Sequence, residues 1–132
     1  MAGADLELCE YLEDEGVGTV GTTIFEGELP AGIVNGMVLT LYPGAPPEHA
    51  LNGVAGATLE ITRLQFRVRN TSEATAIANA QAAAASLSKV ANQTIEGTRY
   101  RSVTVLQAPG LLYRDENNRP NYGFNIEGER EV

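Results

Sequence analysis

Residues 58–90 read TLEITRLQFRVRNTSEATAIANAQAAAASLSKV, and this stretch decides the fold because it predicts a strand followed by a long helix. From about residue 63 to residue 69, apolar and polar side chains alternate, which is typical of a strand with one buried face. The apolar positions are Leu64, Phe66 and Val68, and the polar ones are Arg63, Gln65, Arg67 and Arg69. Leu59 and Ile61 have the opposite parity, which predicts either a bulge near Thr62 or a first half buried on the other face.

The second part of this stretch predicts a helix from residue 73 to about residue 90. Asn70, Thr71 and Ser72 provide capping residues in front of it, and apolar side chains recur at helical spacing within it. That stripe consists of Ile77, Ala80, Ala84, Leu87 and Ala91. Such a helix is roughly 30 Å long, and a core side made mostly of alanine lets it approach a sheet closely.

Outward from this unit, residues 5–15 predict a second helix, with Leu6, Cys9 and Leu12 on one face. Asp5 and Glu7 fall in its first turn, where acidic side chains suit the helix dipole. Further strands are expected at residues 19–25, 37–42, 98–107 and 121–126, with connections at 92–97 and 109–120. We therefore expect an α+β fold: an antiparallel or mixed sheet of about four to five strands, with two helices packed on one face.

Residues 43–57 form the longest irregular stretch, and its prolines are Pro43, Pro46 and Pro47. Loops of this length without structure of their own are uncommon in compact domains unless they have a function. The stretch is either a tolerated surface excursion or a loop that contacts another molecule. We favour the contact loop.

The 132 residues suit one domain over residues 1–132, because domains commonly contain ~100–150 residues. The net charge of −8 argues against a protein that wraps nucleic acid through its whole surface. Cys9 is the single cysteine and His49 the single histidine, which excludes an internal disulfide and a zinc site of the usual Cys/His kind. We expect no metal and no cofactor.

The charge is unevenly distributed along the chain. Residues 1–62 carry ten acids and no Lys or Arg, whereas residues 63–132 carry seven acids and all nine basic residues. The acidic half is either a solvated face or one of two oppositely charged surfaces that let copies associate head-to-tail. The candidate basic strip is Arg63, Arg67, Arg69, Arg99 and Arg101, and the candidate acidic surface is Glu10, Glu13, Asp14 and Glu15.

Catalytic chemistry has little support. His49 follows Glu48 in the irregular stretch, no nucleophile motif accompanies it, and Cys9 lies on the expected buried face of a helix. Asp115 and Glu116 belong to a turn-like run that local side-chain bonds explain. We therefore expect no catalytic residue.

No membrane span or signal sequence is expected. Residues 76–88 are weakly polar but mostly alanine and too short to cross a bilayer, and the N-terminal residues are acidic. A free cysteine without disulfides fits synthesis in a reducing cytoplasm.

Several short motifs follow one another in a specific order. They are residues 42–47 (YPGAPP), 66–69 (FRVR), the Ala-rich helix from Glu73, 97–100 (GTRY), Pro109, 114–120 (RDENNRP) and 122–126 (YGFNI). Over roughly residues 37–130 this order resembles the tail terminator family of long-tailed bacteriophages, often labelled minor capsid proteins. Asn118 stands where that family commonly has Gly, and Asn tolerates the positive φ that such a turn requires.

The resemblance implies a non-enzymatic virion component of the neck, at the head-proximal end of the tail. Members form a hexameric ring that caps the tail tube, ends its polymerisation and joins the head, with a central channel through which the genome passes. The implied partners are further copies of the chain, the tail tube protein, a head-completion protein and DNA that is not specifically bound.

In this setting, the acidic surface of one subunit is expected to face the arginine-bearing strands of the next, with remaining acids lining the channel. Pro43, Pro46 and Pro47 are candidates for contact with a neighbour. Alternatives are another neck protein, a tail tube subunit or, least favoured, a small enzyme using His49 and Glu48.

Overall fold

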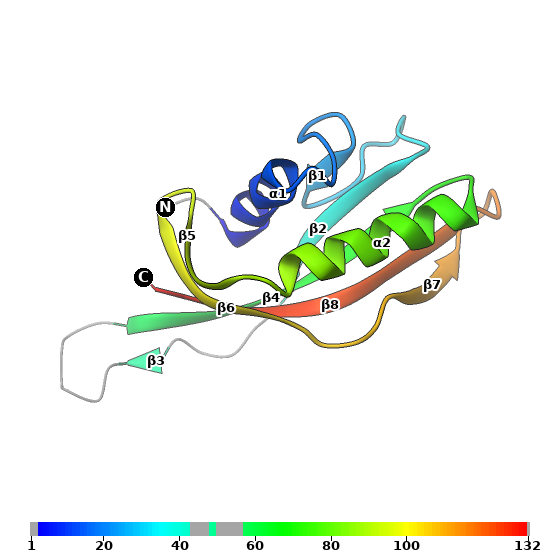
Figure 1. Ribbon diagram of the computed structural model, residues 1–132. Coiled ribbons are helices and arrows are strands. Elements are labelled where there is room, and N and C mark those ends of the chain that lie inside the picture. The colour runs from blue at the N-terminus through cyan, green and yellow to red at the C-terminus, as the bar shows by residue number, and fades with distance from the viewer. Residues whose placement is uncertain (1–2, 43–47, 50–56, 132) are drawn as a thin grey trace.

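The computed structural model describes residues 3–42, 48–49 and 57–131 (Figure 1). It contains two helices, α1 (Ala4–Asp14) and α2 (Glu73–Leu87), and eight strands. The strands are β1 (Ile24–Glu26), β2 (Gly36–Tyr42), β3 (Glu48–His49), β4 (Ala57–Arg69), β5 (Ala91–Ile95), β6 (Thr98–Val105), β7 (Gly110–Arg114) and β8 (Pro120–Glu131).

All strands belong to one mixed sheet with the order β1-β2-β4-β8-β6-β5, to which β3 adds beside β4 and β7 beside β8. Among the strands that the structure describes, β1 and β2 pair in parallel and the other named pairs are antiparallel. The centre is the β4–β8 pair, which runs in one register from Leu59↔Glu131 to Arg69↔Asn121. The predicted α+β class is confirmed, although the sheet has more strands than the four to five expected.

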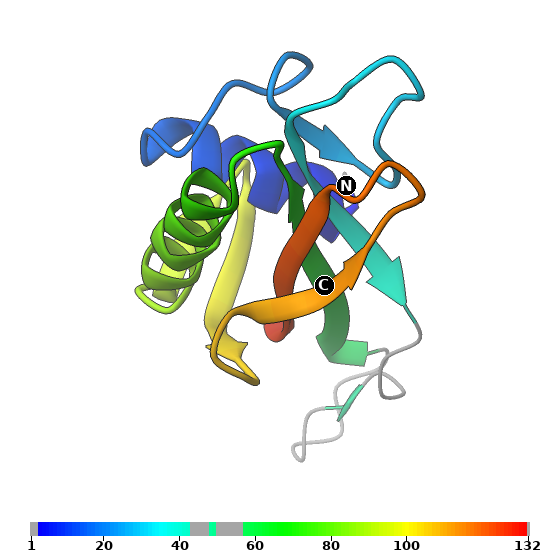
Figure 2. The same ribbon diagram turned by 90° about the vertical axis from the view of Figure 1, so that its right-hand side faces the viewer.

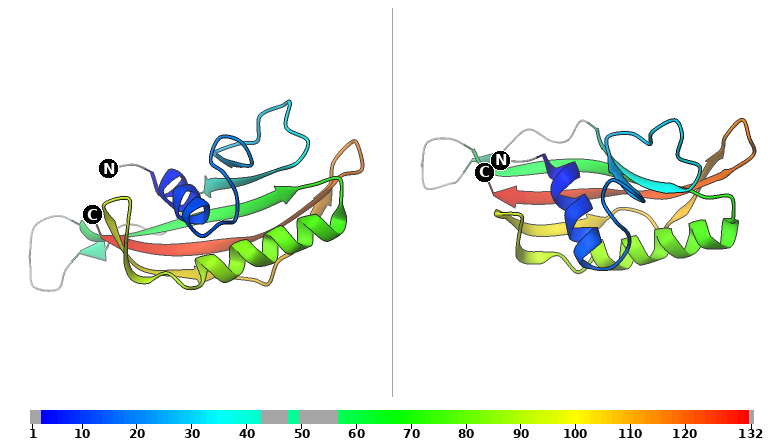
Figure 3. Two further views of the ribbon diagram at one scale, coloured as in Figure 1. Left: turned by 45° about the horizontal axis from the view of Figure 1, so that its top comes forward. Right: turned by 90° about the horizontal axis from the view of Figure 1, so that it is seen from above.

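Both helices pack on the same face of the sheet (Figure 3), as the sequence predicted. Leu64, Phe66 and Val68 of β4 are fully buried beneath them, and the Phe66 ring stacks on Phe124 of β8 at a centroid distance of 5.1 Å. Helix α2 lies against this face through small side chains, since Ala76, Ala80 and Ala83 have no exposed surface. Alanine gives the helix little bulk, so it lies close to β4, β6 and β8.

Helix α2 begins as predicted but ends earlier. Ser72 is the N-cap, and its hydroxyl accepts a hydrogen bond from the Thr75 amide at 3.3 Å. The helix ends at Leu87, so Ala91 of the predicted stripe lies in β5 instead. Ile77 is only half-buried, because the buried stripe contains Ala76 and Ala83 in place of the predicted Ile77 and Ala84.

The predicted strand at 19–25 is mostly a turn. The Thr19 carbonyl accepts hydrogen bonds from the amides of Thr22, Thr23 and Ile24, and Gly21 adopts a φ of 85°. This local bonding leaves only Ile24–Glu26 to pair with β2. Of the irregular stretch 43–57, Pro43, Pro46 and Pro47 lie outside the described residues.

Of the two alternatives for residues 59–62, the bulge near Thr62 is wrong. The β4–β8 register is unbroken there, and Thr62 is buried on the same face as Leu64. The structure agrees with the other alternative, since Leu59 and Ile61 lie on the opposite face and are half-buried there. The bulge occurs instead in β6, between Tyr100 and Ser102. The bulge adds one residue to β6, so the alternation of buried and exposed side chains shifts by one position after it. This is why Arg99 and Arg101 are exposed although Val103, also at an odd position, is buried.

Two strands lie in segments that the sequence indicated as connections. Strand β5 forms a hairpin with β6 through Glu96 and Gly97, whose φ values of 49° and 81° fit a two-residue turn with two positive φ angles. Strand β7 lies within the connection expected at 109–120 and pairs with the first residues of β8. Figure 2 shows β7, in orange, crossing the end of the sheet that faces the viewer.

Candidate interaction surfaces

The predicted basic strip is divided between two places in the fold. Arg63, Arg67 and Arg69 lie on the face of β4 that is turned away from the helices, whereas Arg99 and Arg101 lie on β6. The structure therefore brings the first three together along one strand and keeps the other two apart from them across β8.

The guanidinium groups on β4 have partners within the chain. Arg67 donates a hydrogen bond to the side-chain oxygen of the buried Asn121 at 2.7 Å, and its guanidinium lies 5.9 Å from the centre of the Tyr113 ring. The Arg63 Nε lies 3.5 Å from a Glu127 carboxylate oxygen. Arg67 in particular holds β4, β7 and β8 together.

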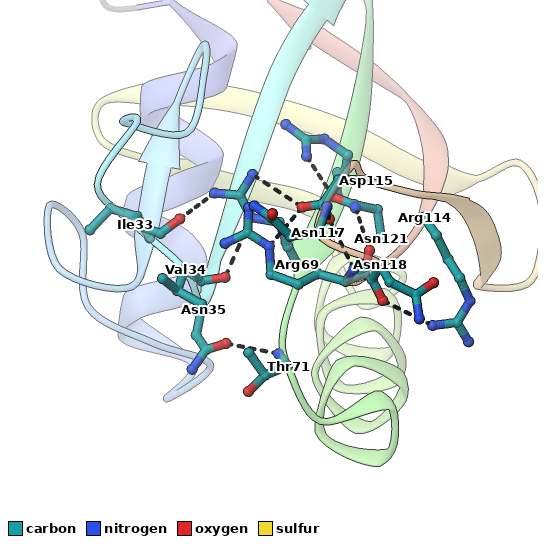
Figure 4. A network of polar contacts seen from close by, with 12 residues as sticks. Ile33, Val34, Asn35, Arg69, Thr71, Arg114, Asp115, Asn117, Asn118 and Asn121 are labelled. Atoms are coloured by element: carbon teal, nitrogen blue, oxygen red, sulfur yellow. Dashed lines mark hydrogen bonds and ion pairs between the residues drawn. The ribbon is translucent and has the colours of Figure 1, made fainter.

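Arg69 joins two loops (Figure 4). Its guanidinium donates hydrogen bonds to the carbonyl oxygens of Ile33 and Val34, in the loop that precedes β2. On the other side it lies 4.0 Å from the carboxylate of Asp115, in the turn between β7 and β8. Arg67 and Arg69 therefore position the β7–β8 hairpin over the end of the sheet.

The turn that begins at Asp115 has the local bonding that the sequence predicted. One Asp115 carboxylate oxygen accepts hydrogen bonds from the amides of Asn117 and Arg119 at 3.0 and 2.9 Å, and the other accepts one from Arg119 Nε at 2.8 Å. Asn118 adopts a φ of 59°, the conformation for which Asn replaces Gly. Burial raises the pKa of Asp115, but these bonds to Arg119 and Asn117 outweigh it, so the net pKa is lowered.

Arg99 and Arg101 are the more accessible pair of the basic strip. Their side chains are 49% and 52% exposed, and both approach the same Glu131 carboxylate oxygen, at 3.2 and 3.8 Å. Exposed ion pairs contribute little to stability. These two arginines are therefore available to a partner without a large cost to the fold.

The predicted acidic surface follows the C-terminal half of α1. Glu13 accepts a hydrogen bond from the Val20 amide at 2.8 Å, and Glu15 lies 3.9 Å from Lys89. Partial burial and the neighbouring Glu96 raise the pKa of Glu10. Asp14 is exposed. The ion pairs that these acids form within the chain do not involve the predicted basic strip, so any pairing between the two surfaces would be between subunits.

A buried charge cluster was missed in the sequence. Glu7 of α1 is 1% exposed, and its carboxylate accepts hydrogen bonds from Arg130 at 2.9 Å, from Tyr100 at 2.8 Å and from Thr98. Arg130 also donates to Glu60 at 2.9 Å. Burial, and after it the bond to Glu7, raises the pKa of the Tyr100 hydroxyl. The sequence does indicate that Glu7 is buried, because its spacing places it on the same helix face as the buried Ala4 and Tyr11.

Cys9 is a buried thiol, as predicted. It has no exposed surface, and its sulfur lies 3.6 Å from the Phe25 carbonyl oxygen. Burial, with smaller effects of Asp5 and Glu26, raises the pKa of the thiol to about 12. It therefore stays protonated near neutral pH and is a poor nucleophile.

Within residues 3–42, 48–49 and 57–131, no three His, Cys, Asp or Glu side chains gather closely enough to hold a metal ion. Neither helix in this part of the chain has both the length and the apolar character needed to cross a membrane. The backbone of Glu48 and His49 forms β3 beside β4, and the structure does not describe their side chains. The alternative that uses His49 and Glu48 as an enzyme site stays a prediction.

The fold and these surfaces define an α+β protein whose charged and hydrogen-bonding groups lie along strands, hairpins and a helix end. Residues 11–131 match the family described as bacteriophage tail terminator protein, and the chain belongs to this family. It is thus a structural tail protein of the phage type and a virion component.

The fold is also similar to that of a chain in a solved structure described as the virion of a native gene transfer agent (GTA) particle. The two share 18% sequence identity at a TM-score of 0.56, over 98% of this chain and 87% of the other. A comparison with curated proteins found no match.

Proposed function

We propose that this chain forms a hexameric ring that caps the head-proximal end of a phage tail tube. The ring ends polymerisation of the tube, offers the surface that joins the head, and leaves a channel through which DNA passes. Membership of the tail terminator family over residues 11–131 carries this proposal. A single domain over residues 1–132 is part of it, supported by one continuous hydrophobic core that both helices share.

The proposed role is structural and needs no catalytic residue, cofactor or metal. Its partners are further copies of the chain, the tail tube protein and a head-completion protein of the neck. DNA passes without specific binding, which the net charge of −8 supports because phosphates are repelled. Glu10, Glu13, Asp14 and Glu15 are the acids proposed for the channel or for a subunit interface.

Electron microscopy of tails that carry a labelled copy of this protein tests the position. We expect the label at the head-proximal end, one cluster per tail. Particles that lack the protein are expected to have tubes of uncontrolled length without attached heads. Label along the whole tube would instead identify a tube subunit, and tubes of normal length without the protein would contradict the terminator role.

Charge pairing between subunits is proposed to help close the ring, with the basic strip of one copy facing the acids of the next. Arg99 and Arg101 are the better probes, since Arg67 and Arg69 also hold the β7–β8 hairpin. Replacing Arg99 and Arg101 by Glu is expected to weaken ring formation while monomer unfolding stays unchanged. An unchanged ring would remove these two arginines from the interface.

A further inference from the structure

Most of the large apolar side chains that remain exposed in the described part of the chain gather at one place. This first group is Leu106, Leu111, Leu112 and Tyr113; Leu41 near the end of β2 is a second exposed site, Val34 lies beyond the other end of that strand, and all six are 40–49% exposed. Exposed apolar side chains that cluster on a soluble protein indicate a binding surface. The first group and Leu41 lie on different edges of the sheet, because β2 and β7 are on opposite sides of the β4–β8 pair.

The first group surrounds an edge strand. β7 pairs with β8 along one edge, and the register slips between Leu111 and Tyr113, so consecutive side chains are exposed. A groove of about 270 Å³ lies beside β7, lined by the side chains of Leu111 and Leu112 and by the backbone of Gly110 and Gly123. An apolar edge strand of this kind is a template for pairing with another strand.

The second exposed site lies at the other edge. β1 covers β2 only at Met37, Val38 and Leu39, so residues 40–42 extend beyond it, and Leu41 is 44% exposed there. Val34, in the loop before β2, is at the opposite end of that strand and is not part of this site. In the part of the chain that the structure describes, no strand pairs with residues 40–42 on this side.

The two edges also differ in charge close to these side chains. β7 carries Arg114 and no acid, whereas Arg99 and Arg101 lie at the other end of β6, beside Glu131. Glu26, which pairs opposite Leu39, and Glu28 just after β1 are exposed and lie near residues 40–42. The two edges thus combine exposed apolar side chains with opposite charge, which is what a head-to-tail contact between copies requires.

We propose that β7 of one copy docks along the exposed edge of β2, at residues 40–42, in a second copy, with Leu111 and its apolar neighbours against Leu41. This contact rests on the proposed ring function and assigns its subunit interface. Because it joins two different surfaces, each copy has one surface left to bind the next, and the chain of contacts can close into a ring. The other edge strand, β5, exposes the polar Asn92, Gln93 and Thr94 and is not part of the contact.

Two single variants test this interface. Leu111→Asp damages the β7 surface and leaves β2 intact, whereas Leu41→Asp does the reverse. Each variant alone is expected to lose ring formation, with association weakened at least tenfold, and to sediment as a monomer. An equimolar mixture is expected to form dimers and nothing larger, because the intact β7 of Leu41→Asp can dock on the intact β2 of Leu111→Asp only once.

Gln93→Asp, at an exposed position of β5, is the matched control and should form rings like the unmodified protein. Circular dichroism checks that each variant is folded, and Leu106→Asp replaces Leu111→Asp if that variant unfolds. Rings in both single variants, or no dimers in the mixture, would overturn the docking. The docking would also be overturned if the unmodified protein stayed monomeric and Leu111→Asp abolished its binding to the tail tube. In that case β7 would be the surface that binds the tube protein.

Tail length separates this inference from the ring function. If Leu111→Asp and Leu41→Asp still form rings and particles keep tails of normal length, the docking is wrong while the terminator role stands. If rings of the unmodified protein leave tube length uncontrolled, the terminator role fails whatever the interface.

Discussion

Asp115 shows how one side chain determines a local conformation. Its carboxylate accepts three hydrogen bonds from Asn117 and Arg119 and lies beside Arg69, so it stabilises the turn that carries β7 into β8. Since the surface proposed for docking lies on β7, this carboxylate acts on assembly through the position of the hairpin.

We expect the pH dependence of stability to report on this carboxylate. Its pKa in the folded chain lies below the ordinary value of 3.8, so it contributes stability that is complete above that pH and is lost as the pH falls through the lower folded value. Asp115→Asn is expected to lower the melting temperature at pH 7 and to converge with the unmodified protein in strong acid. Thermal unfolding from pH 7 to pH 2 measures the difference, and a gap that stays constant with pH would contradict the assignment.

Among the glycines that the structure describes, Gly123 is the one at which a side chain is least tolerable. A Cβ at this position would lie 2.1 Å from the Phe66 carbonyl oxygen, a backbone atom that cannot rotate away. Gly123→Ala is therefore expected to destabilise the protein by about 1–3 kcal/mol, the range of overpacked cores. Gly110→Ala is the matched control, since nothing lies within 4 Å of a Cβ there. Urea unfolding compares them, and equal midpoints would contradict the close packing.

At the scale of elements, the buried pair of Glu7 and Arg130 fastens α1 to the end of β8. Arg130→Met would leave the Glu7 carboxylate buried without its cation, which typically costs about 3–5 kcal/mol. Glu7→Gln together with Arg130→Met is expected to recover much of this loss, because no charge is then left buried. Arg63→Met removes a half-exposed partner of Glu127 and should cost less than about 1 kcal/mol. Similar losses in both single variants would contradict a buried cluster.

The elements that the sequence predicted correctly are those whose side chains alternate or recur without interruption. β4 and α2 follow directly from Leu64, Phe66 and Val68 and from the alanine stripe after Ser72. β5 was missed because its exposed residues Asn92, Gln93 and Thr94 have no apolar pattern, and only the pairing with β6 makes them a strand.

The candidate surfaces were predictable to a similar extent. Arg99 and Arg101 were found from the sequence, and their exposure follows from the bulge after Tyr100, which no local pattern indicates. Leu111, Leu112 and Tyr113 were passed over because an apolar run between Pro109 and a polar turn has the same pattern whether it is buried or exposed. Their exposure depends on how β7 pairs with β8, a contact that is set by the whole hairpin.

At the scale of the whole molecule, a net charge of −8 predicts that copies of the chain repel each other. The charges next to the proposed contact oppose this, because Arg114 is the only charged residue of β7, whereas Glu26 at the end of β1 and Glu28 just after it lie near residues 40–42. At 0.1 M salt, charges more than about 10 Å apart are largely screened, so the groups near the contact dominate its rate. Association should therefore be attractive in spite of the total charge.

The dimer formed by mixing Leu41→Asp with Leu111→Asp isolates one such contact and allows its kinetics to be measured. Between 0.1 and 0.5 M salt its association rate is expected to fall, because salt screens an attraction. When Arg114 is changed to Glu in Leu41→Asp, both sides of the contact become acidic, so the rate at low salt should drop and then rise with salt. Lys89→Glu, a charge reversal outside β6 and β7, should keep the original direction. A salt dependence with the same sign in all three pairs would mean that the total charge, and not its distribution over the two edges, governs how copies of this protein meet.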